Sequence, residues 1–357
     1  MKKFLRTFIL ISTMLLLILF SSCGKDNTET TNEDTKTTSK AELKVSDFFP
    51  FLENTHMVYN GYGNEYAPFE TYVEYIKGSI MQVRNINAGT ISAVVYKIEN
   101  GELKRLLSMG EVYYRYDFTS FSDNNEEILL KEPIKKGTSW TLKNNDKRSI
   151  TSIDKSITTP AGTYNTIEVT TEGTYSTTMD YYAKDIGLVK RVFQSKEVEG
   201  EIVSELEKIE KDVPYKESIN IYFPDFDKDK LAYVNTKLEY YTNQDAKDVI
   251  ETAMKNIPEG SGLSKVISDN TKILNIKLDD ENEKVVVDFS SNLITEMNAG
   301  TTLESMILQS ITNTFGGYFQ RQKVEITIEG NPYSSGHILM QAGECFTVNT
   351  ENCYEYK

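Results

Sequence analysis

The sequence has few of the side chains that most often carry catalysis or bind transition metals. Its 357 residues include three cysteines, one tryptophan and two histidines, His56 and His337. No third partner lies near either histidine in sequence, and no Gly-x-Ser-x-Gly or His-Glu-x-x-His motif is present. The sequence therefore predicts no catalytic site, no metal site and no cofactor, and we expect a protein that is not an enzyme. Because carboxylates are numerous, a hydrolase with two acidic residues hidden among them is a competing interpretation.

Positive charge is scarce as well. The chain carries 39 lysines and arginines against 53 aspartates and glutamates, which gives a net charge of −14 at pH 7. Removal of residues 1–22 as a signal peptide would take away three positive charges and bring the net charge to about −17. A strongly acidic surface repels nucleic acid and anionic lipid, so we expect no nucleic-acid partner.

No hydrophobic run near the N-terminus is long enough for an ordinary spanning helix. A short positive segment is followed by the apolar run 9–20, and the cysteine comes almost directly after it. Phe20-Ser21-Ser22-Cys23 resembles the lipobox of bacterial lipoproteins, in which the cysteine receives a diacylglycerol. The resemblance implies a signal peptide over 1–22, lipidation at Cys23 and anchoring to the outer side of the cytoplasmic membrane. An ordinary secretory signal with a chance cysteine is the alternative.

Two further regions follow the cysteine. Residues 23–44 contain almost no apolar side chain, which predicts a disordered linker between the lipid and the folded protein. Residues 45–212 alternate apolar and polar side chains in short runs separated by turn residues, which predicts an antiparallel β domain, a meander or half-barrel. Asn100-Gly101 between two such runs is the clearest hairpin signal. The segment 181–190 resembles β-rich envelope lipoprotein domains with half-barrel shapes, some of which carry lipid.

The pattern changes after Val213-Pro214, where strands alternate with two amphipathic helices. The first helix follows Thr242 and must end before Pro258, because proline lacks the backbone donor that a continuing helix needs. The second helix has an apolar stripe of Leu303, Met306, Ile307, Ile311 and Phe315. We expect Thr301 to Glu304 to form its capping box, Gly316-Gly317 to end it, and Glu304, Gln309 and Asn313 to face outward.

Five segments of this region resemble the GerMN domain, a module named after a bacterial sporulation and germination protein. They are Ile221-Tyr222-Phe223-Pro224, Val287-Asp288-Phe289-Ser290, Gly300 to Glu304, Ile311-Thr312-Asn313-Thr314 and Val324 to Gly330. The resemblance implies an α+β domain over 213–330 in which two helices pack on one face of a small sheet. It also implies an assembly or scaffold role in the cell envelope, with envelope or sporulation proteins as partners, and it brings no catalytic residues.

The C-terminal tail, 331–357, holds the other two cysteines. Cys345 and Cys353 are eight positions apart, and disulfides form readily outside the cytoplasm, so the pair is a candidate disulfide. In an anaerobic habitat both would stay thiols.

Two acidic clusters and the tyrosines complete the candidate sites. Asp225, Asp227 and Asp229 begin like a calcium loop, but Lys230 replaces the required glycine, so a solvated turn is the better interpretation. Asp279 to Glu283 is expected to be a hairpin turn. The 22 tyrosines suit strand surfaces, and they also suit a binding face for a glycan, peptide or protein.

The sequence as a whole predicts an α+β protein: an antiparallel β domain followed by a GerMN-like domain, anchored by lipid outside the cytoplasm. Its expected function is that of a scaffold or binding protein of the envelope. The alternative is a carrier that holds a lipid or glycan in the β domain.

Overall fold

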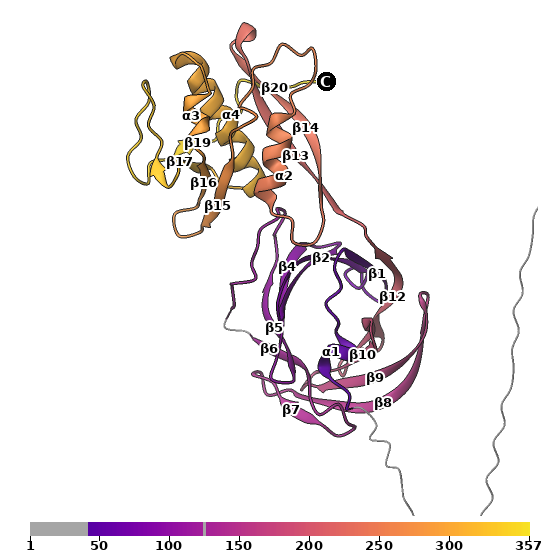
Figure 1. The fold of residues 1–357 in the computed structure, drawn as a ribbon. Helices are drawn as coiled ribbons and strands as arrows, with labels where there is room; N and C mark the ends of the chain where they lie inside the picture. The colour runs from indigo at the N-terminus through magenta and orange to yellow at the C-terminus, as the bar shows by residue number, and fades with distance from the viewer. Residues whose placement is uncertain (1–41, 124–125) are drawn as a thin grey trace, which may run out of the picture. The chain divides into compact units, whose positions relative to one another are not determined.

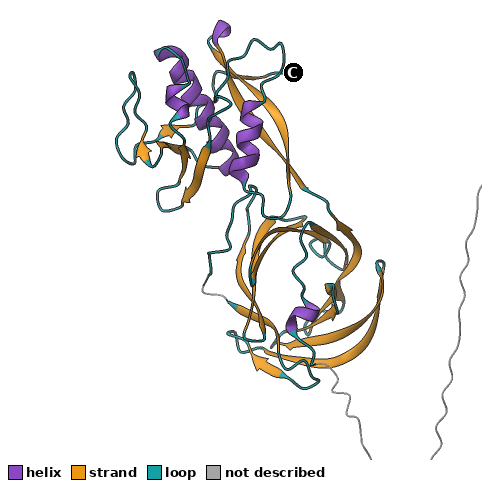
Figure 2. Cartoon of the chain, viewed as in Figure 1, coloured by secondary structure: helices purple, strands orange, loops and turns teal. Residues whose placement is uncertain are grey.

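The structure is a computed structural model that describes residues 42–123 and 126–357. The first half of this part of the chain is a single twelve-stranded antiparallel sheet that curls into a near-barrel (Figures 1 and 2). Its strands are β1 (Thr55–Tyr62), β2 (Phe69–Lys77), β3 (Ile80–Asn87), β4 (Ile91–Glu99), β5 (Glu102–Met109), β6 (Glu127–Lys131), β7 (Ser139–Thr141), β8 (Lys147–Thr159), β9 (Gly162–Glu172), β10 (Ser176–Ala183), β11 (Gly187–Ser195) and β12 (Glu201–Lys211). The predicted antiparallel β domain is confirmed.

Strand order follows the chain in two halves, β6-β5-β4-β3-β2-β1 and then β12-β11-β10-β9-β8-β7. Pairing of β1 with β12 joins the halves, so β6 and β7 are the two edges of the sheet. Short hairpins make most of the connections. At the predicted Asn100-Gly101 turn both residues have positive φ, 53° and 72°, as a two-residue hairpin requires.

The chain enters the described region inside the curl of this sheet. Helix α1 (Val45–Phe48) lies within the ring of strands in Figure 1 and buries both Val45 and Phe48. The amide of Val45 donates to a carboxylate oxygen of Glu132 at 2.8 Å. The segment that follows α1 stays in the interior, where Phe49 packs on Tyr96 with ring centroids 5.0 Å apart. These residues fill part of the interior that the strands enclose.

The second half of the described chain is α+β, as predicted. Strands β13 (Tyr215–Asp225) and β14 (Lys230–Tyr240) form a hairpin around the short 3-10 helix η1 (Phe226–Lys228). They are followed by α2 (Ala246–Lys255), β15 (Ile273–Asp279), β16 (Lys284–Phe289), α3 (Asn292–Thr295), α4 (Thr301–Phe319) and β17 (Lys323–Ile328), then by the short strands β18 (Asn331–Pro332), β19 (Phe346–Thr347) and β20 (Cys353–Glu355). Helix α2 ends before Pro258, and the acidic turns at 225–229 and 279–283 connect hairpin strands.

The sheet arrangement corrects one expectation. The two helices were expected on one face of a single small sheet, but β13 and β14 pair with β20, while β15, β16, β17, β18 and β19 form another sheet. Helix α4 contacts strands of both sheets. Because the hairpin and the later strands bury their apolar faces on opposite sides of one helix, they need not pair with each other.

Burial on both sides also corrects the reading of α4. Twelve of its 19 residues are buried, among them Glu304 and Asn313, which were expected to face outward. The N-cap is Gly300 without a side-chain cap, so the predicted capping box is wrong. The helix runs through Gly316-Gly317 to Phe319 and ends at Gln320, whose φ is 56°. A Cβ at Gly316 would lie 2.2 Å from Val348 Cγ2, so close packing explains this glycine.

Residues 42–357 form one compact unit, and a buried polar cluster lies where β2 and β3 meet the second half of the chain. Glu74 accepts from Arg84 Nε at 2.7 Å and from Gln82 at 2.7 Å, and all three side chains are buried. Buried Arg115 donates to the carbonyls of Glu74, Tyr241 and Gln244. These bonds link the near-barrel to the loop before α2. The division between 45–212 and 213–330 stays a prediction.

Candidate functional site

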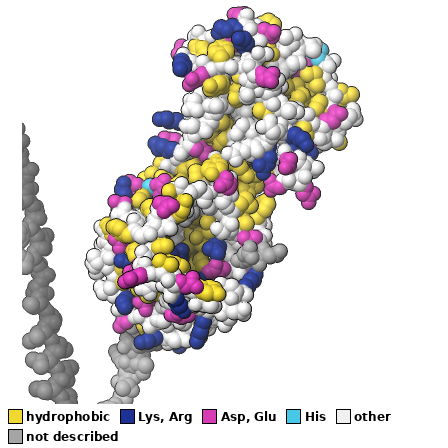
Figure 3. Space-filling model, turned by 180° about the vertical axis from the view of Figure 1, so that it is seen from behind, with side chains coloured by type: hydrophobic (Ala, Val, Ile, Leu, Met, Phe, Trp, Pro, Cys, Tyr) yellow, Lys and Arg dark blue, Asp and Glu magenta, His cyan; other side chains and the backbone are white. Residues whose placement is uncertain are grey.

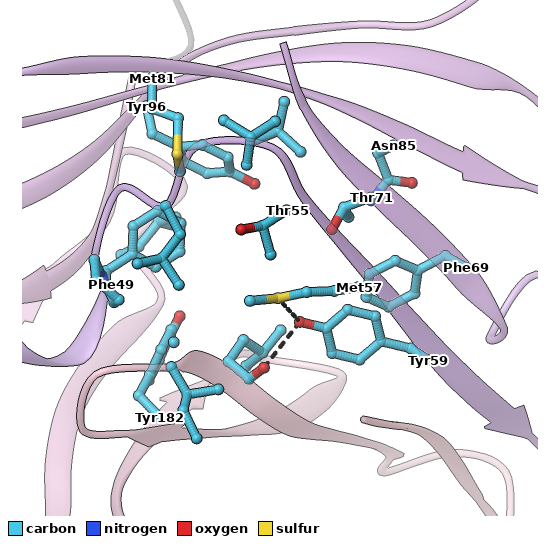
Figure 4. A pocket seen from close by; sticks show the side chains of 18 of the residues that line it. Phe49, Thr55, Met57, Tyr59, Phe69, Thr71, Met81, Asn85, Tyr96 and Tyr182 are labelled. Atoms are coloured by element: carbon cyan, nitrogen blue, oxygen red, sulfur yellow. Dashed lines mark hydrogen bonds between the residues drawn. The ribbon is translucent and has the colours of Figure 1, made fainter. Parts of the chain in front are cut away.

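The interior of the near-barrel contains an apolar chamber of about 140 Å³. Strands β1 to β4 supply one side, while β10, β11 and the segment after α1 supply the other. Figure 4 shows Met57, Tyr96 and Tyr182 pointing from different elements toward one space. The lining also includes Phe49, Tyr59, Phe69, Val83 and Leu188. An apolar cavity of about this size is large enough for one benzene-sized group, so the chamber can take part of a hydrocarbon chain.

Few polar atoms of the chamber are engaged with one another. Tyr59 Oη donates to the carbonyl of Leu188 at 2.9 Å and lies 3.5 Å from Met57 Sδ (Figure 4). Burial raises the pKa of Tyr59, Tyr96 and Tyr182 above the usual tyrosine range, so their hydroxyls stay protonated. The hydroxyls of Tyr96 and Tyr182 have no hydrogen-bond partner among the residues described. They can donate to a ligand in the chamber.

A second, larger cavity of about 720 Å³ adjoins the chamber and has a polar wall. The two cavities share Leu129 and Arg191. The wall of this outer cavity includes Arg105, Glu126, Glu127, Asp146, Arg148 and Asp180. An apolar chamber beside a polar outer cavity matches the two ends of an amphipathic molecule.

The outer cavity lies at the seam between the two edge strands of the sheet. Strands β6 and β7 are not paired by backbone hydrogen bonds; instead, side chains cross between them. The carbonyl of Ile128 on β6 accepts from Trp140 Nε1 at 3.0 Å and from Arg148 Nη1 at 2.7 Å. Side chains can change rotamer at far lower cost than a strand ladder can separate, so these contacts close the seam less firmly than backbone pairing would.

Arg191 has an unusual position for a charged side chain. It keeps 44% of its side-chain area accessible although it lines both cavities inside the sheet. Its Nε and Nη2 donate to the two carboxylate oxygens of Asp180 at 2.6 and 3.1 Å. The negative charge of Asp180 raises the pKa of Arg191 further, so the guanidinium stays charged. Arg191 therefore sets one fixed positive charge at the junction of chamber and outer cavity.

The other arginines of the outer cavity share a single carboxylate. Arg105 and Arg148 each donate to a different oxygen of Glu127, at 2.5 and 2.7 Å. Two guanidinium groups with one carboxylate leave an excess of positive charge and of hydrogen-bond donors at this part of the wall. Both Glu127 oxygens accept hydrogen bonds, so the remaining N–H donors of Arg105 and Arg148 are in excess over the acceptors that Glu127 supplies.

The predicted cysteine sites are placed as follows. Cys23 lies outside the described residues, so its lipidation stays a prediction. Cys345 and Cys353 are unpaired in the structure, and the candidate disulfide stays a prediction. Cys345 precedes β19, which pairs with β17, whereas Cys353 begins β20, which pairs with β14. The two thiols therefore belong to different sheets, and pairing within the tail places them apart.

The two histidines are held by carboxylates. His56 lies between Glu70 and Glu210, at 2.8 and 3.0 Å, and His337 Nδ1 is 2.7 Å from Glu304. Across 42–123 and 126–357, no group of three or more histidine, cysteine, aspartate or glutamate residues is arranged to hold a metal ion. Neither histidine lines the chamber or the outer cavity.

Sequence reasoning noted the tyrosines as a binding face but missed the arginines. Tyr59, Tyr96 and Tyr182 turn inward to the chamber, not outward to a surface. Arg191 carried one usable signal: the chain has 32 lysines and only seven arginines, and arginine at an inward strand position implies a bidentate partner. Which strand face points inward could not be known, because the register shifts at Tyr181/Tyr182.

Comparison with known proteins assigns the second half of the chain. The profile of the Germane family, described as sporulation and spore germination, matches residues 220–334. These residues are a Germane, or GerMN, domain, as the sequence resemblance predicted. The match covers less than half of the chain, and a search of the curated proteins finds no match.

Several solved structures resemble parts of this chain at low similarity. One is a protein from Bacteroides fragilis described as exported with a YmcC-like fold: identity 19%, TM-score 0.30, covering 46% of this chain and 99% of that one. Another holds the tandem GerMN domains of the sporulation protein GerM from Bacillus subtilis: identity 16%, TM-score 0.30, coverage 40% and 48%. A third, described as a lipoprotein from Clostridium perfringens, has identity 14%, TM-score 0.25 and coverage 38% and 88%. TM-scores this low support no conclusion about function, which must come from the cavities of the near-barrel.

Proposed function

We propose that this protein is a lipid-anchored binding protein of the bacterial cell envelope that holds an apolar chain inside its near-barrel. The observation that carries the proposal is the apolar chamber, which adjoins a polar cavity at the seam of the sheet and shares Leu129 and Arg191 with it. Barrels of about eight strands are filled by side chains, and wider ones leave room for a ligand. The twelve strands here surround such a space, which α1 and Phe49 fill only in part.

Binding is proposed in place of catalysis because the acidic side chains of the outer cavity are engaged. Glu127 and Asp180 accept from arginines, Glu126 from Lys104 at 2.9 Å, and Asp146 from Asn144 at 2.8 Å. A general acid or base needs a carboxyl group free to exchange a proton with its substrate. These four carboxylates are better placed to orient donors than to transfer protons.

A displacement assay tests the proposal. A chain that starts at Gly24 retains the whole compact unit and can be titrated with N-phenyl-1-naphthylamine, an uncharged probe that fluoresces in apolar surroundings. Val83 lines the chamber, so Val83→Phe should fill the space and weaken probe binding by about tenfold or more, equivalent to about 1.4 kcal/mol. Val198 is 69% exposed, and Val198→Phe is the matched control that should bind as the wild type does. Equal binding by both variants would contradict the proposal.

Anchoring is the second part of the proposal. The partner is the cytoplasmic membrane, reached through a diacylglycerol on Cys23. Among the residues described, no helix is long and apolar enough to cross a membrane. Cys23→Ala should release the protein from membranes, measured by sedimentation after a carbonate wash. A variant that still sediments, together with wild-type protein that lacks acyl mass, would show the anchor to be wrong.

A scaffold role for the Germane domain is the second candidate, and the family description on sporulation and spore germination favours it. Envelope or sporulation proteins would be its partners, and nucleic acid would not. On the face shown in Figure 3, positive and negative side chains are interspersed, without a broad basic area. Leu339 is 68% exposed beside the domain, so Leu339→Glu should weaken capture of a protein partner from membranes without lowering the melting temperature. Unchanged capture by this variant and by Phe226→Glu, also at an exposed apolar position, would count against a scaffold.

A further inference from the structure

We propose that the ligand of the near-barrel is an anionic amphiphile, a hydrocarbon chain that ends in a carboxylate or phosphate, and that Arg191 binds its head group. The proposal rests on the function proposed above and adds the chemical class of the ligand. The chain would lie in the apolar chamber and the head group at the junction with the outer cavity. This assignment follows from the position of Arg191, from its unused donors and from the donors around Glu127 in the surrounding wall.

The position of Arg191 matches a head group at the end of a buried chain. Two residues line both cavities, Arg191 and the apolar Leu129. Arg191 is therefore the charged one of the two. A chain that extends from the chamber toward the outer cavity would have its end near the guanidinium. A charged head group placed deeper would lose its hydration without a partner, which costs several kcal/mol.

Arg191 has donors to spare for such a group. A guanidinium carries five N–H donors, and Asp180 occupies only one on Nε and one on Nη2. Nη1 has no hydrogen-bond partner in the described part of the chain. Asp180 is nearly buried, with 5% of its side chain accessible, so it holds the guanidinium plane in place. The free edge of a fixed guanidinium fits two oxygens of a carboxylate or phosphate.

Two hydroxyl donors line the same chamber as Arg191. Tyr96 and Tyr182 point into the chamber from β4 and β10, as Figure 4 shows, and neither hydroxyl has a partner among the residues described. Burial raises the pKa of both tyrosines, so their hydroxyls stay protonated and can donate. The chamber thus offers the unused O–H groups of Tyr96 and Tyr182 and the unused N–H groups of Arg191 as donors. A ligand that supplies acceptors satisfies them.

The wall of the outer cavity has four basic and four acidic side chains, and its donors around Glu127, not its net charge, favour an anion over a neutral or cationic head group. Arg191 and Asp180 neutralise each other, but Arg105 and Arg148 share Glu127 and leave one positive charge in excess. Glu126 is paired with Lys104, whereas Asp146 accepts from the uncharged amide of Asn144 and keeps its negative charge, so the positive excess is local to Glu127. A cationic head group would meet three guanidinium groups with no free carboxylate oxygen among those of Glu127 and Asp180.

Head-group competition in the displacement assay tests the proposal. The chain from Gly24 onward is loaded with N-phenyl-1-naphthylamine and titrated with decanoate, decyl phosphate, decanol and decyltrimethylammonium, which share one chain length. Decanoate or decyl phosphate should displace the probe at about tenfold lower concentration than decanol, because charge-assisted hydrogen bonds are the stronger ones. The preferred anion distinguishes a fatty acid from a phosphate-headed lipid.

Substitution of Arg191 locates the preference. Arg191→Lys keeps the positive charge beside Asp180 but lacks the paired N–H groups with which a guanidinium binds two oxygens. The ratio of anion affinity to decanol affinity should therefore fall about threefold or more. The double variant Asp180→Asn/Arg191→Gln removes both charges together and should bring the ratio close to one. Arg321 pairs with Asp280 outside both cavities, and Arg321→Lys is the matched control that should keep the wild-type ratio.

The outcomes separate the two proposals. Displacement by decanol and decanoate at equal concentrations in the wild type overturns the head-group site and leaves the apolar chamber as a binding site. An Arg191→Lys variant that keeps the wild-type ratio also overturns the role of Arg191. A wild-type protein that binds neither probe nor any of the four amphiphiles overturns the proposed function and this inference with it.

Discussion

The near-barrel and the Germane domain use buried space in opposite ways. The near-barrel surrounds a chamber and a polar cavity, with the charged side chain of Arg191 accessible inside. In the Germane domain, α4 lies against two sheets and is buried on most sides, down to its serine, threonine and asparagine side chains. Ser310 and Thr312 donate to carbonyls four residues earlier, so these hydroxyls are satisfied within the helix. The number of strands determines how wide the space inside a curled sheet is. Two sheets that pack on a helix can instead move close to it and leave little space.

The largest expected effect is at the buried polar cluster that joins the two regions. Glu74→Gln removes the charge that pairs with Arg84 at 2.7 Å, with both side chains 1% accessible. Loss of one partner from a buried pair leaves an uncompensated charge, so we expect a loss of about 3–5 kcal/mol in unfolding free energy. Chemical denaturation measures it.

The matched control for this cluster is Glu239→Gln, which breaks the exposed pair of Glu239 with Lys216 and should cost at most about 1 kcal/mol. If Glu74→Gln costs no more than that control, the cluster does not couple the two regions. Separate unfolding transitions for the two regions in the Glu74 variant would sharpen the comparison.

The second-largest effect compares the packing of the two regions through one leucine substitution in each. Leu308 on α4 is 1% exposed, and Leu308→Ala should cost about 2–5 kcal/mol because the surrounding side chains cannot fully close the gap. Leu188 lines the chamber and already lacks neighbours on one side, so Leu188→Ala should cost less. Equal losses in the unfolding free energy would mean that the chamber wall is packed as tightly as the Germane core.

The smallest of the three effects concerns Glu304 and depends on pH. Burial alone would raise the pKa of Glu304, but hydrogen bonds from Ser335, His337 and Tyr333 outweigh it and hold the pKa below its usual value. A depressed carboxyl pKa contributes stability above the unfolded-state pKa of about 4.3, and that stability is lost as pH falls through the folded-state pKa.

Glu304→Gln should therefore cost about 1–3 kcal/mol at pH 7 through the weakened hydrogen bonds. The difference from wild type in denaturation should begin to shrink as pH falls below the unfolded-state pKa of about 4.3, and should be lost as pH falls through the lower folded-state pKa, where the wild-type carboxylate is protonated too. Ser305→Ala, at an exposed neighbouring position, is the control and should change stability by at most about 0.5 kcal/mol. A difference that stays constant with pH would contradict the role of the charge.

The periodicity of apolar side chains predicted which segments are helices and which are strands. The predictions of capping and of exposed positions failed at α4, which is buried on both sides. The Asn100-Gly101 hairpin and the end of α2 before Pro258 needed only local chemistry. The capping box at Thr301–Glu304 had the right pattern, yet Glu304 turns toward Tyr333, Ser335 and His337 from the C-terminal tail. Side chains about thirty residues further along the chain bind the Glu304 carboxylate in place of the capping interaction. A local sequence pattern cannot show such a distant partner.

The sequence by itself determined a β-rich half followed by an α+β half, because strand and helix periods are local properties of side-chain order. It also determined the Germane resemblance and an acidic surface. Only the tertiary structure decided that twelve strands curl around a chamber, that β13 and β14 separate from β15–β17, and that Cys345 and Cys353 stay apart. It likewise brought Arg191 on β11 and Tyr96 on β4 to the wall of one chamber. Those pairings depend on long-range register and on which face of each strand turns inward, and a shift of one residue reverses that face.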